Sequence, residues 1–206
     1  SERPWVLQEF ISGQEFCTHS TVREGKILLH CCCASSDFQL RYYHVDHPAI
    51  LDWVEKFVSR YNLTGQISFD FIVKNNGDVM PIECNPRTHS AITCFYNSDF
   101  VSRTYLEPDM LPDNYVCQPE KNARETYWFY YELWKLFKVR SFSALLQQIK
   151  LFVFGKEAVL DGKDPLPFLM LNHWQIPCLL IKAAWLNKPW VRIDFNIGKL
   201  VELGGD

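Results

Sequence analysis

The chain has 206 residues, of which 48% are hydrophobic and 22% are charged. This composition is typical of a globular protein and excludes collagen, low-complexity linkers and coiled coils. A chain of this length buries enough surface to hold a core without disulfides. Its 21 basic and 24 acidic residues give a net charge of −3, and the basic residues do not cluster, so nucleic acid is not an expected partner.

Eight cysteines are scattered through the chain, and three of them, Cys31, Cys32 and Cys33, are consecutive. Consecutive residues of a strand point to alternate faces, so this run cannot build a compact disulfide framework. The pattern indicates buried thiols in a reducing compartment, and we expect a cytoplasmic protein. A zinc site that joins His30 to the cysteines is the alternative, although the usual Cys-x-x-Cys pairs are missing.

The first hundred residues alternate between strand patterns and turn residues, with one helix among them. Pro48 stands where a helix can begin, and apolar residues then recur at three- and four-residue steps up to Tyr61. The predicted strands cover residues 5–11, 15–22, 26–33, 66–73 and 79–84. Together these elements predict an α+β fold over residues 1–107, in which an antiparallel sheet is flanked by helices.

A different pattern begins near Pro108. Residues 108–119 are rich in proline and are expected to form a loop, after which we predict helices over 127–137 and 141–154. The apolar stretch 166–186 is long enough to cross a bilayer, but it contains Lys182 and two prolines, so a buried helix pair is the better interpretation. Residues 108–206 are therefore predicted to form an aromatic-rich, mainly helical extension.

The most informative segment is a predicted hairpin, in which two strands flank an Asn-Asn-Gly-Asp turn. With Lys74 placed opposite Val79, Asp70 falls opposite Glu83. Directly opposed side chains of an antiparallel pair share one face and lie about 5 Å apart, where like charges repel each other. This pair of carboxylates therefore needs a counter-charge.

The counter-charge has two interpretations. The same register places Ser68 opposite Asn85, on the face of the two acids, and carboxylate and amide oxygens suit a hard cation such as Mg²⁺. Because Mg²⁺ with few protein ligands usually completes its shell with waters and substrate phosphates, the hairpin predicts a nucleotide-phosphate metal site. The alternative is a structural hairpin that a neighbour such as Arg87 neutralises.

The segment Glu83-Cys-Asn-Pro-Arg87, which follows a Phe-Asp-Phe strand, resembles the ATP-grasp superfamily. The resemblance implies that Asp70, Glu83 and Asn85 bind Mg²⁺, with two ions expected and Mn²⁺ as a substitute, and that these ions bridge the phosphates of ATP. It also implies that Arg87 steadies the transferred phosphoryl group or the acid substrate, which suits its planar fork. The chain would then be the C-terminal part of an ATP-grasp fold, followed by the helical extension.

The start of the chain, from Gln8 to Glu15, resembles the hinge of the same family. The resemblance implies that Gln8 flanks the adenine amino group and that Glu9 and Ile11 offer backbone groups to the adenine edge. Glu15 would bind the ribose hydroxyls. Without the resemblance, Gln8 and Glu9 are an exposed strand edge and Glu15 is a solvated turn residue.

A narrower resemblance is to the ATP-grasp ligases that make mycosporine-like amino acids. It implies a carbon–nitrogen ligase that joins an amino acid, glycine, to a phosphate-activated cyclohexenone-type acid such as 4-deoxygadusol. Another ATP-grasp amino-acid or amine ligase with a different acid, and a truncated, non-catalytic nucleotide-binding module, remain alternatives. The family's phosphate-gripping Lys and its lid are expected in an N-terminal half that precedes Ser1. The segments that carry this resemblance are 17–21, 83–92, 164–169, 173–177 and 192–198.

Two histidines, His19 and His89, are candidate contacts for substrate or phosphate. His89 follows Arg87 by two residues and joins it as a candidate catalytic residue, although a hydrogen-bonded structural role is the commoner outcome for either histidine. Ser68 departs from the family, since several ATP-grasp ligases carry an Arg there. A second Arg-x-Asp-Phe segment, residues 192–195, is not followed by Glu-x-Asn and is interpreted as structural.

Overall fold

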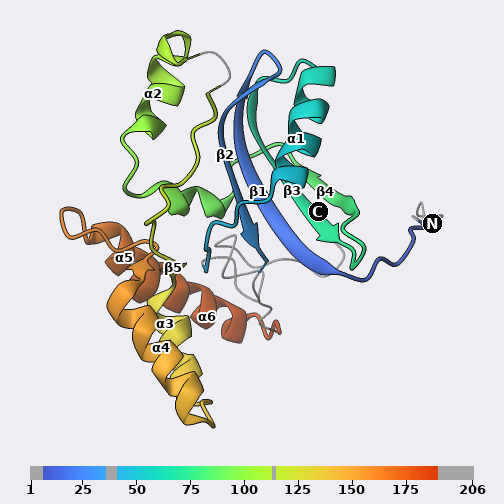
Figure 1. Cartoon of the computed structure of the whole chain (residues 1–206). Helices are drawn as coiled ribbons and strands as arrows, with labels where there is room; N and C mark the ends of the chain where they lie inside the picture. The colour runs from blue at the N-terminus through green and yellow to red at the C-terminus, as the bar shows by residue number, and fades with distance from the viewer. Residues whose placement is uncertain (1–6, 36–40, 113–114, 190–206) are drawn as a thin grey trace. The chain divides into compact units, whose positions relative to one another are not determined.

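The computed structural model describes residues 7–35, 41–112 and 115–189 (Figure 1). The chain divides into two units, residues 1–156 and 157–206. The predicted boundary between residues 107 and 108 falls inside the first unit and stays a prediction. The second Arg-x-Asp-Phe segment, and the segment 192–198 to which it belongs, lie outside the described residues.

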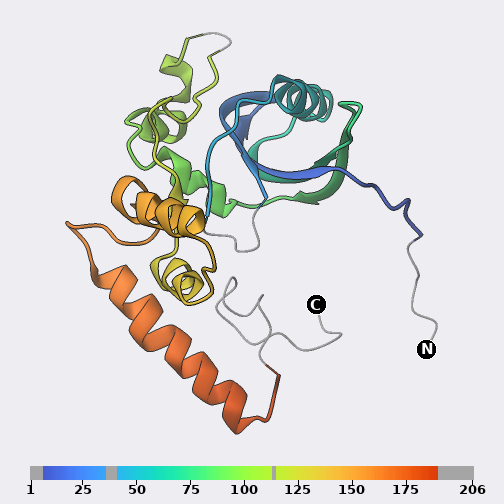
Figure 2. The same cartoon turned by 60° about the horizontal axis from the view of Figure 1, so that its bottom comes forward.

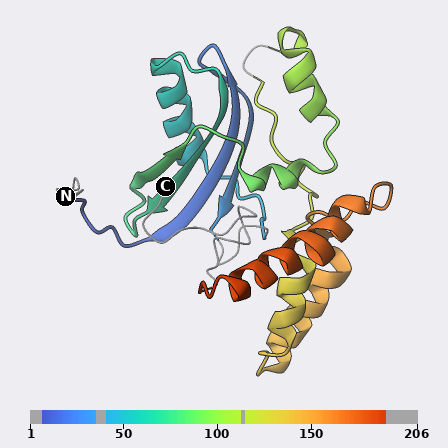
Figure 3. The same cartoon turned by 180° about the vertical axis from the view of Figure 1, so that it is seen from behind.

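A four-stranded antiparallel sheet forms the centre of the first unit (Figure 1, Figure 3). Its spatial order is β2-β1-β3-β4. The strands are β1 (Gln14–Arg23), β2 (Lys26–Ala34), β3 (Gly65–Val73) and β4 (Val79–Asn85). The four strands predicted between residues 15 and 84 are therefore confirmed, and with them the antiparallel sheet with flanking helices.

The strand predicted over residues 5–11 is wrong for the part of it that the structure describes. Residues 7–11 are irregular and largely exposed. No neighbouring strand pairs with them within the described part of the chain, and an unpaired strand would leave its backbone groups without ladder hydrogen bonds. The chain becomes regular only at Gln14, where β3 provides a partner.

Helix α1 (Pro48–Arg60) covers one face of the sheet (Figure 2). A proline occupies its first turn, and Nδ1 of His47 caps the helix by accepting a hydrogen bond from the Ile50 N–H at 3.4 Å. Ile50, Val54 and Val58 are fully buried against the apolar side chains of the sheet. Each such side chain contributes roughly 1.5–3 kcal/mol by leaving water, so this face is core.

The other face of the sheet is partly covered by a short 3₁₀ helix, η1 (Ser90–Phe95). Cys32 lies in the core under α1, whereas Cys31 and Cys33 lie on the η1 face, so the consecutive cysteines alternate as predicted. All eight cysteines are free thiols, and six of them are buried. The core on the η1 face consists of Cys17, Leu29, Cys31, Cys33, Tyr42, Ala91, Cys94, Phe95 and Cys117.

The zinc alternative finds no support in this arrangement. His30 shares the α1 face, where its Nδ1 lies 2.9 Å from the Ser20 hydroxyl, whereas Cys31 and Cys33 point to the opposite face. Among the residues that the structure describes, no group of three His, Cys, Asp or Glu side chains is placed to hold a metal ion.

The remainder of the first unit is mainly helical. The helix predicted over 127–137 begins only at Phe129, because Thr126 forms a bridge with Tyr42. The buried carboxylate of Glu132, on α3 (Phe129–Leu136), accepts hydrogen bonds from Lys135 Nζ at 3.0 Å and from Gln148 Nε2 of α4 (Phe142–Phe154) at 2.7 Å. The elements are α2 (Phe100–Leu106), η2 (Pro108–Met110), β5 (Thr126–Tyr127), α3 (Phe129–Leu136), α4 (Phe142–Phe154) and β6 (Lys156–Glu157), which ends in the second unit.

In the described residues of the second unit, 157–189, the stretch 166–185 forms one helical run, and the predicted buried helix pair is wrong. Pro177 has no N–H for the carbonyl oxygen of His173, and the run accommodates it with a π-turn instead of ending. Apolar side chains along the run are exposed, including Ile181 at 69% and Trp185 at 87%. Of the helices in the described residues, none is long and apolar enough to cross a membrane. The run consists of α5 (Leu166–Met170), the π-turn η3 (Leu171–Gln175) and α6 (Ile176–Trp185).

Candidate functional site

The hairpin of β3 and β4 brings the predicted acidic pair together. Asp70 lies opposite Glu83, and Ser68 lies opposite Asn85, as the sequence predicts. Opposed residues share a face, so the two carboxylates and the amide lie on the same face of the sheet. This is also the face of Cys17, the residue of β1 that pairs with Asp70.

The register next to the turn differs from the prediction, which is wrong at this point. Val79 pairs with Val73 instead of Lys74. Lys74 belongs to the turn, where its N–H donates to the Asp78 carbonyl oxygen and its own carbonyl oxygen accepts from Gly77, both at 2.9 Å. Gly77 has a φ of 91°, which other residues rarely adopt, so the turn is built around this glycine.

A β-bulge restores the predicted register beyond the turn. Phe71 pairs with Pro81, but the next pair is Asp70 with Glu83, which leaves Ile82 as the extra residue. Proline has no N–H for the ladder, so a strand tolerates it best at a bulge or an edge, and β4 is both. The error at the turn therefore does not reach the acidic pair.

Asp70 is a half-buried carboxyl in an acidic neighbourhood. Burial, followed by the negative charges of Glu83 and Glu15, raises the pKa of Asp70 to about 6, against the opposing effect of Arg87. Within the described residues, neither Asp70 nor Glu83 forms an ion pair. The acidic side chains on this face repel one another, and a bound cation would relieve that repulsion.

Asn85 is the last residue of β4, and Arg87 lies just beyond it. The Arg87 N–H donates to the carbonyl oxygen of Asn85 at 2.8 Å, so the chain turns back directly after the strand. The exposed guanidinium of Arg87 reaches the carbonyl oxygen of Thr88 at 3.4 Å and forms none of the ion pairs among the described residues. Its positive charge opposes the rise in the pKa of Asp70.

His19 and His89, which the sequence treated separately, are joined by the fold. Both are buried, and the backbone N–H of His89 donates to Nδ1 of His19 at 3.3 Å. Nδ1 of His89 accepts in turn from the N–H of Ala91 at 3.2 Å and so caps η1. Burial lowers the pKa of each imidazole to about 4, helped by His89 in the case of His19 and by Arg87 in the case of His89.

The predicted adenine-binding residues precede β1. Gln8 and Glu9 are exposed and Ile11 is half-buried. In the part of the chain that the structure describes, no hydrogen bond or ion pair connects these three residues to the hairpin. Glu15 differs, since its pairing with Ile72 puts it near Asp70. The sequence missed this proximity because the hairpin was considered without its neighbour β1.

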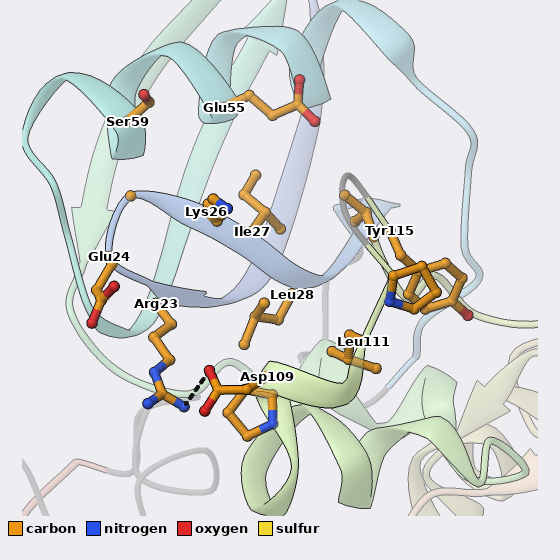
Figure 4. A pocket seen from close by; sticks show the side chains of 14 residues that line it. Arg23, Glu24, Lys26, Ile27, Leu28, Glu55, Ser59, Asp109, Leu111 and Tyr115 are labelled. Atoms are coloured by element: carbon orange, nitrogen blue, oxygen red, sulfur yellow. Dashed lines mark ion pairs between the residues drawn. The ribbon is translucent and has the colours of Figure 1, made fainter.

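Two cavities of the described residues have walls without Asp70 or Glu83. One of about 630 Å³ has walls that include Arg23, Glu55 and Asp109, with Arg23 and Asp109 paired at 3.8 Å (Figure 4). Arg23 lies roughly 20 Å along β1 from the residue that pairs with Asp70. A second cavity, of about 440 Å³, lies against α4. Neither wall contains a predicted site residue.

No family model and no curated protein matches the chain. Among solved structures, the ATPase subunit of phosphoribosylaminoimidazole carboxylase from Aquifex aeolicus matches 41% of this chain at 14% identity and a TM-score of 0.32. N5-carboxyaminoimidazole synthetase from Staphylococcus aureus, complexed with ADP, matches 41% at 12% identity and a TM-score of 0.33. The ADP complex of purK, an N5-carboxyaminoimidazole ribonucleotide synthetase, matches 45% at 13% identity and a TM-score of 0.33. The matches span 29%, 25% and 26% of those three proteins.

Proposed function

We propose that the chain is part of an ATP-dependent carbon–nitrogen ligase of the ATP-grasp superfamily. The observation that supports this most is the opposed pair Asp70 and Glu83, which forms no ion pair with any described residue. Two adjacent carboxylates that form no ion pair repel each other and destabilise the fold, so a bound cation is the simplest reason for keeping both. The order of hinge, metal strand and Glu-x-Asn segment along the chain supports the same family.

We expect Asp70, Glu83 and Asn85 to hold Mg²⁺, as two ions or with Mn²⁺ in their place. The three side chains offer only oxygen ligands, which Mg²⁺ prefers, and they are few enough to leave coordination positions for phosphate oxygens. When bound, the ions would neutralise the charge that develops on the phosphates. Arg87 would bind an oxyanion of the phosphoryl group or of the acid substrate through its planar fork.

The irregular segment before β1 would bind the base of ATP. Backbone groups of Glu9 and Ile11 would meet the adenine edge, with Gln8 beside the amino group. Glu15 would take the ribose hydroxyls. The place of Glu15 near Asp70 supports this assignment, because it puts the proposed ribose and phosphate groups on one end of the sheet.

The proposed reaction has two steps. The γ-phosphoryl group of ATP moves to an oxygen of the acid, which gives ADP and a phosphorylated acid. The amine nitrogen then attacks the activated carbon, the carbon–nitrogen bond forms, and the carbon–oxygen bond to phosphate breaks as the amine loses a proton to solvent. The protein contributes positioning and charge neutralisation to both steps.

The substrates we favour are 4-deoxygadusol, whose enol is a vinylogous acid, and glycine. These are the substrates of mycosporine-glycine synthase, and the segments around Cys17 and Glu83 support that choice. The alternative is an ATP-grasp ligase with a different acid. Ser68 stands where several ATP-grasp ligases carry an arginine, and Arg87 would take over that contact to the acid.

An assay of products tests the proposal. The longest natural form of the polypeptide would receive ATP, Mg²⁺, 4-deoxygadusol and glycine, and the products would be identified by mass spectrometry while ADP is counted. We expect mycosporine-glycine in a 1:1 ratio to ADP. ADP release with another acid and amine would retain the ligase and replace the substrates. No ADP with any acceptor, together with no binding of Mg·ATP, would overturn the proposal.

A further inference from the structure

Two imidazoles on the face of the acidic pair are linked in series by backbone amides. His19 belongs to β1, and His89 follows β4. The His89 N–H donates to Nδ1 of His19, and the Ala91 N–H donates to Nδ1 of His89. This chain of contacts connects the middle of the sheet to the first turn of η1.

The contacts determine where each ring carries its proton. A ring nitrogen that accepts a hydrogen bond from an N–H group has no proton of its own, so both Nδ1 atoms are bare. A neutral imidazole then carries its proton on Nε2. The lowered pKa of His19 and of His89, about 4 in each case, agrees with two neutral rings at neutral pH.

The two rings differ in what they can reach. His19 has no exposed surface, and its Nε2 has no hydrogen-bond partner among the described residues. It therefore acts on its surroundings through Nδ1, by holding the backbone of His89. His89 keeps a small exposed area of 8%, and its ring packs edge-on against Tyr42 with centroids 5.5 Å apart. With Nδ1 occupied and the ring plane set, Nε2–H is the free donor of His89.

We propose that His89 donates its Nε2–H hydrogen bond to an anionic oxygen of the acid substrate beside Arg87, and that His19 is the positioning residue that holds His89 in this tautomer. The inference rests on the proposed function. Arg87 supplies positive charge to the oxyanion, and it precedes His89 by only two residues in the segment that follows β4. The neutral Nε2–H of His89 orients the oxyanion through a directional hydrogen bond and adds no further positive charge. His89 cannot serve as a base for the amine while Nε2 is protonated.

Paired substitutions of His89 test the donor. His89→Asn keeps an acceptor near the Nδ1 position but removes the donor at Nε2, whereas His89→Gln can place an amide N–H near Nε2. We expect His89→Asn to raise the KM for the acid roughly 10- to 100-fold, as the loss of a hydrogen bond to a charged group does, and His89→Gln to recover part of that loss. Binding of Mg·ATP should stay within about threefold of wild type in both variants.

The same logic, with the opposite substitution, tests His19. Asn can supply the acceptor that Nδ1 of His19 provides, whereas Leu cannot. We therefore expect His19→Leu to raise the KM for the acid and His19→Asn to keep it near the wild-type value. Since His19→Leu can also fail to fold, the tautomers are measured directly in the wild-type protein by ¹⁵N NMR. We expect both Nε2 atoms to be protonated and both Nδ1 atoms to be bare.

The outcomes separate this inference from the proposed function. A protonated Nδ1 in either ring, or an unchanged acid KM in His89→Asn with intact Mg·ATP binding, would overturn the inference alone. A wild-type protein that neither binds Mg·ATP nor releases ADP would overturn the proposed function on which it rests.

Discussion

At the scale of single residues, the fold changes the proton affinity of the side chains that it buries. His30 is 2% exposed, and burial, followed by the charges of His44 and His19, lowers its pKa from 6.5 to about 3. The unfolded chain takes up a proton near pH 6.5, but the folded protein does not take it up until about pH 3. His30 therefore leaves the stability of the folded protein unaffected above pH 6.5. Below pH 6.5 it lowers the free energy of unfolding progressively, until the pH reaches about 3.

We predict that His30→Asn weakens the acid dependence of stability. Asn keeps a polar partner for Ser20 but does not titrate, so the slope of unfolding free energy against pH between 6.5 and 4 should fall by up to about 1.4 kcal/mol per pH unit. Urea unfolding at a series of pH values measures this slope. His173→Asn, at an exposed position, is the matched control. Equal slopes in His30→Asn and wild type would show that His30 titrates normally in the folded state.

The residue scale also shows what the sequence can predict. The pairing of Asp70 with Glu83 is predicted from the period of a strand and from a four-residue turn, and it is correct because the bulge at Ile82 offsets the error at that turn. The link between His19 and His89 is not local, because it depends on the path of the chain after β4. No spacing rule connects residues 70 positions apart, so this part of the site required the structure.

At the scale of elements, β1 begins where the chain passes very close to β3. A Cβ atom added to Gly13 would lie 2.2 Å from the Val73 carbonyl oxygen and 2.8 Å from Ile72 Cγ2. Only a residue without a side chain fits this approach, which ties the segment before β1 to the end of the hairpin. The close approach fixes Gly13, which stands between the proposed adenine-binding residues and Glu15, against the end of β3.

We predict that Gly13→Ala separates the segment before β1 from β3. The overpacking should destabilise the protein by about 1–3 kcal/mol and should weaken ATP binding. Denaturant unfolding and nucleotide titration measure the two effects. Gly162→Ala is the control, because nothing lies within 4 Å of a Cβ built there. If Gly13→Ala is as stable as this control, the close approach is not a constraint on the fold.

The errors of the sequence-based elements have physical reasons. The register at the turn is wrong because Ile82 is extruded next to Pro81, and a bulge is invisible to a count that assumes regular pairing. The strand over 5–11 is wrong in its described part because a strand forms only where a neighbouring strand pairs with it, and residues 7–11 have no such neighbour among the described residues. α1, by contrast, begins as predicted at a proline, and α4 begins one residue later than predicted because Ser141 caps the helix.

At the scale of the whole molecule, the candidate site lies in one of the two units. Every predicted site residue, from Gln8 to His89, belongs to the first unit. The second unit shows where reasoning from apolar content fails, because a stretch such as 166–186 has the same composition whether its side chains are buried or exposed. Exposure depends on which other surfaces are present, and periodicity carries no information about them.

The measurement that tests the central claim most directly is calorimetric titration of ATP, with and without Mg²⁺, into wild type and Glu83→Gln. Glu55→Gln, which removes one exposed carboxylate from α1, is the matched control. We predict that wild type and Glu55→Gln bind ATP only with Mg²⁺, and that Glu83→Gln loses this binding because one metal ligand is gone. Mg²⁺-dependent ATP binding by Glu83→Gln with wild-type affinity would contradict the assignment of this hairpin as a metal–nucleotide site.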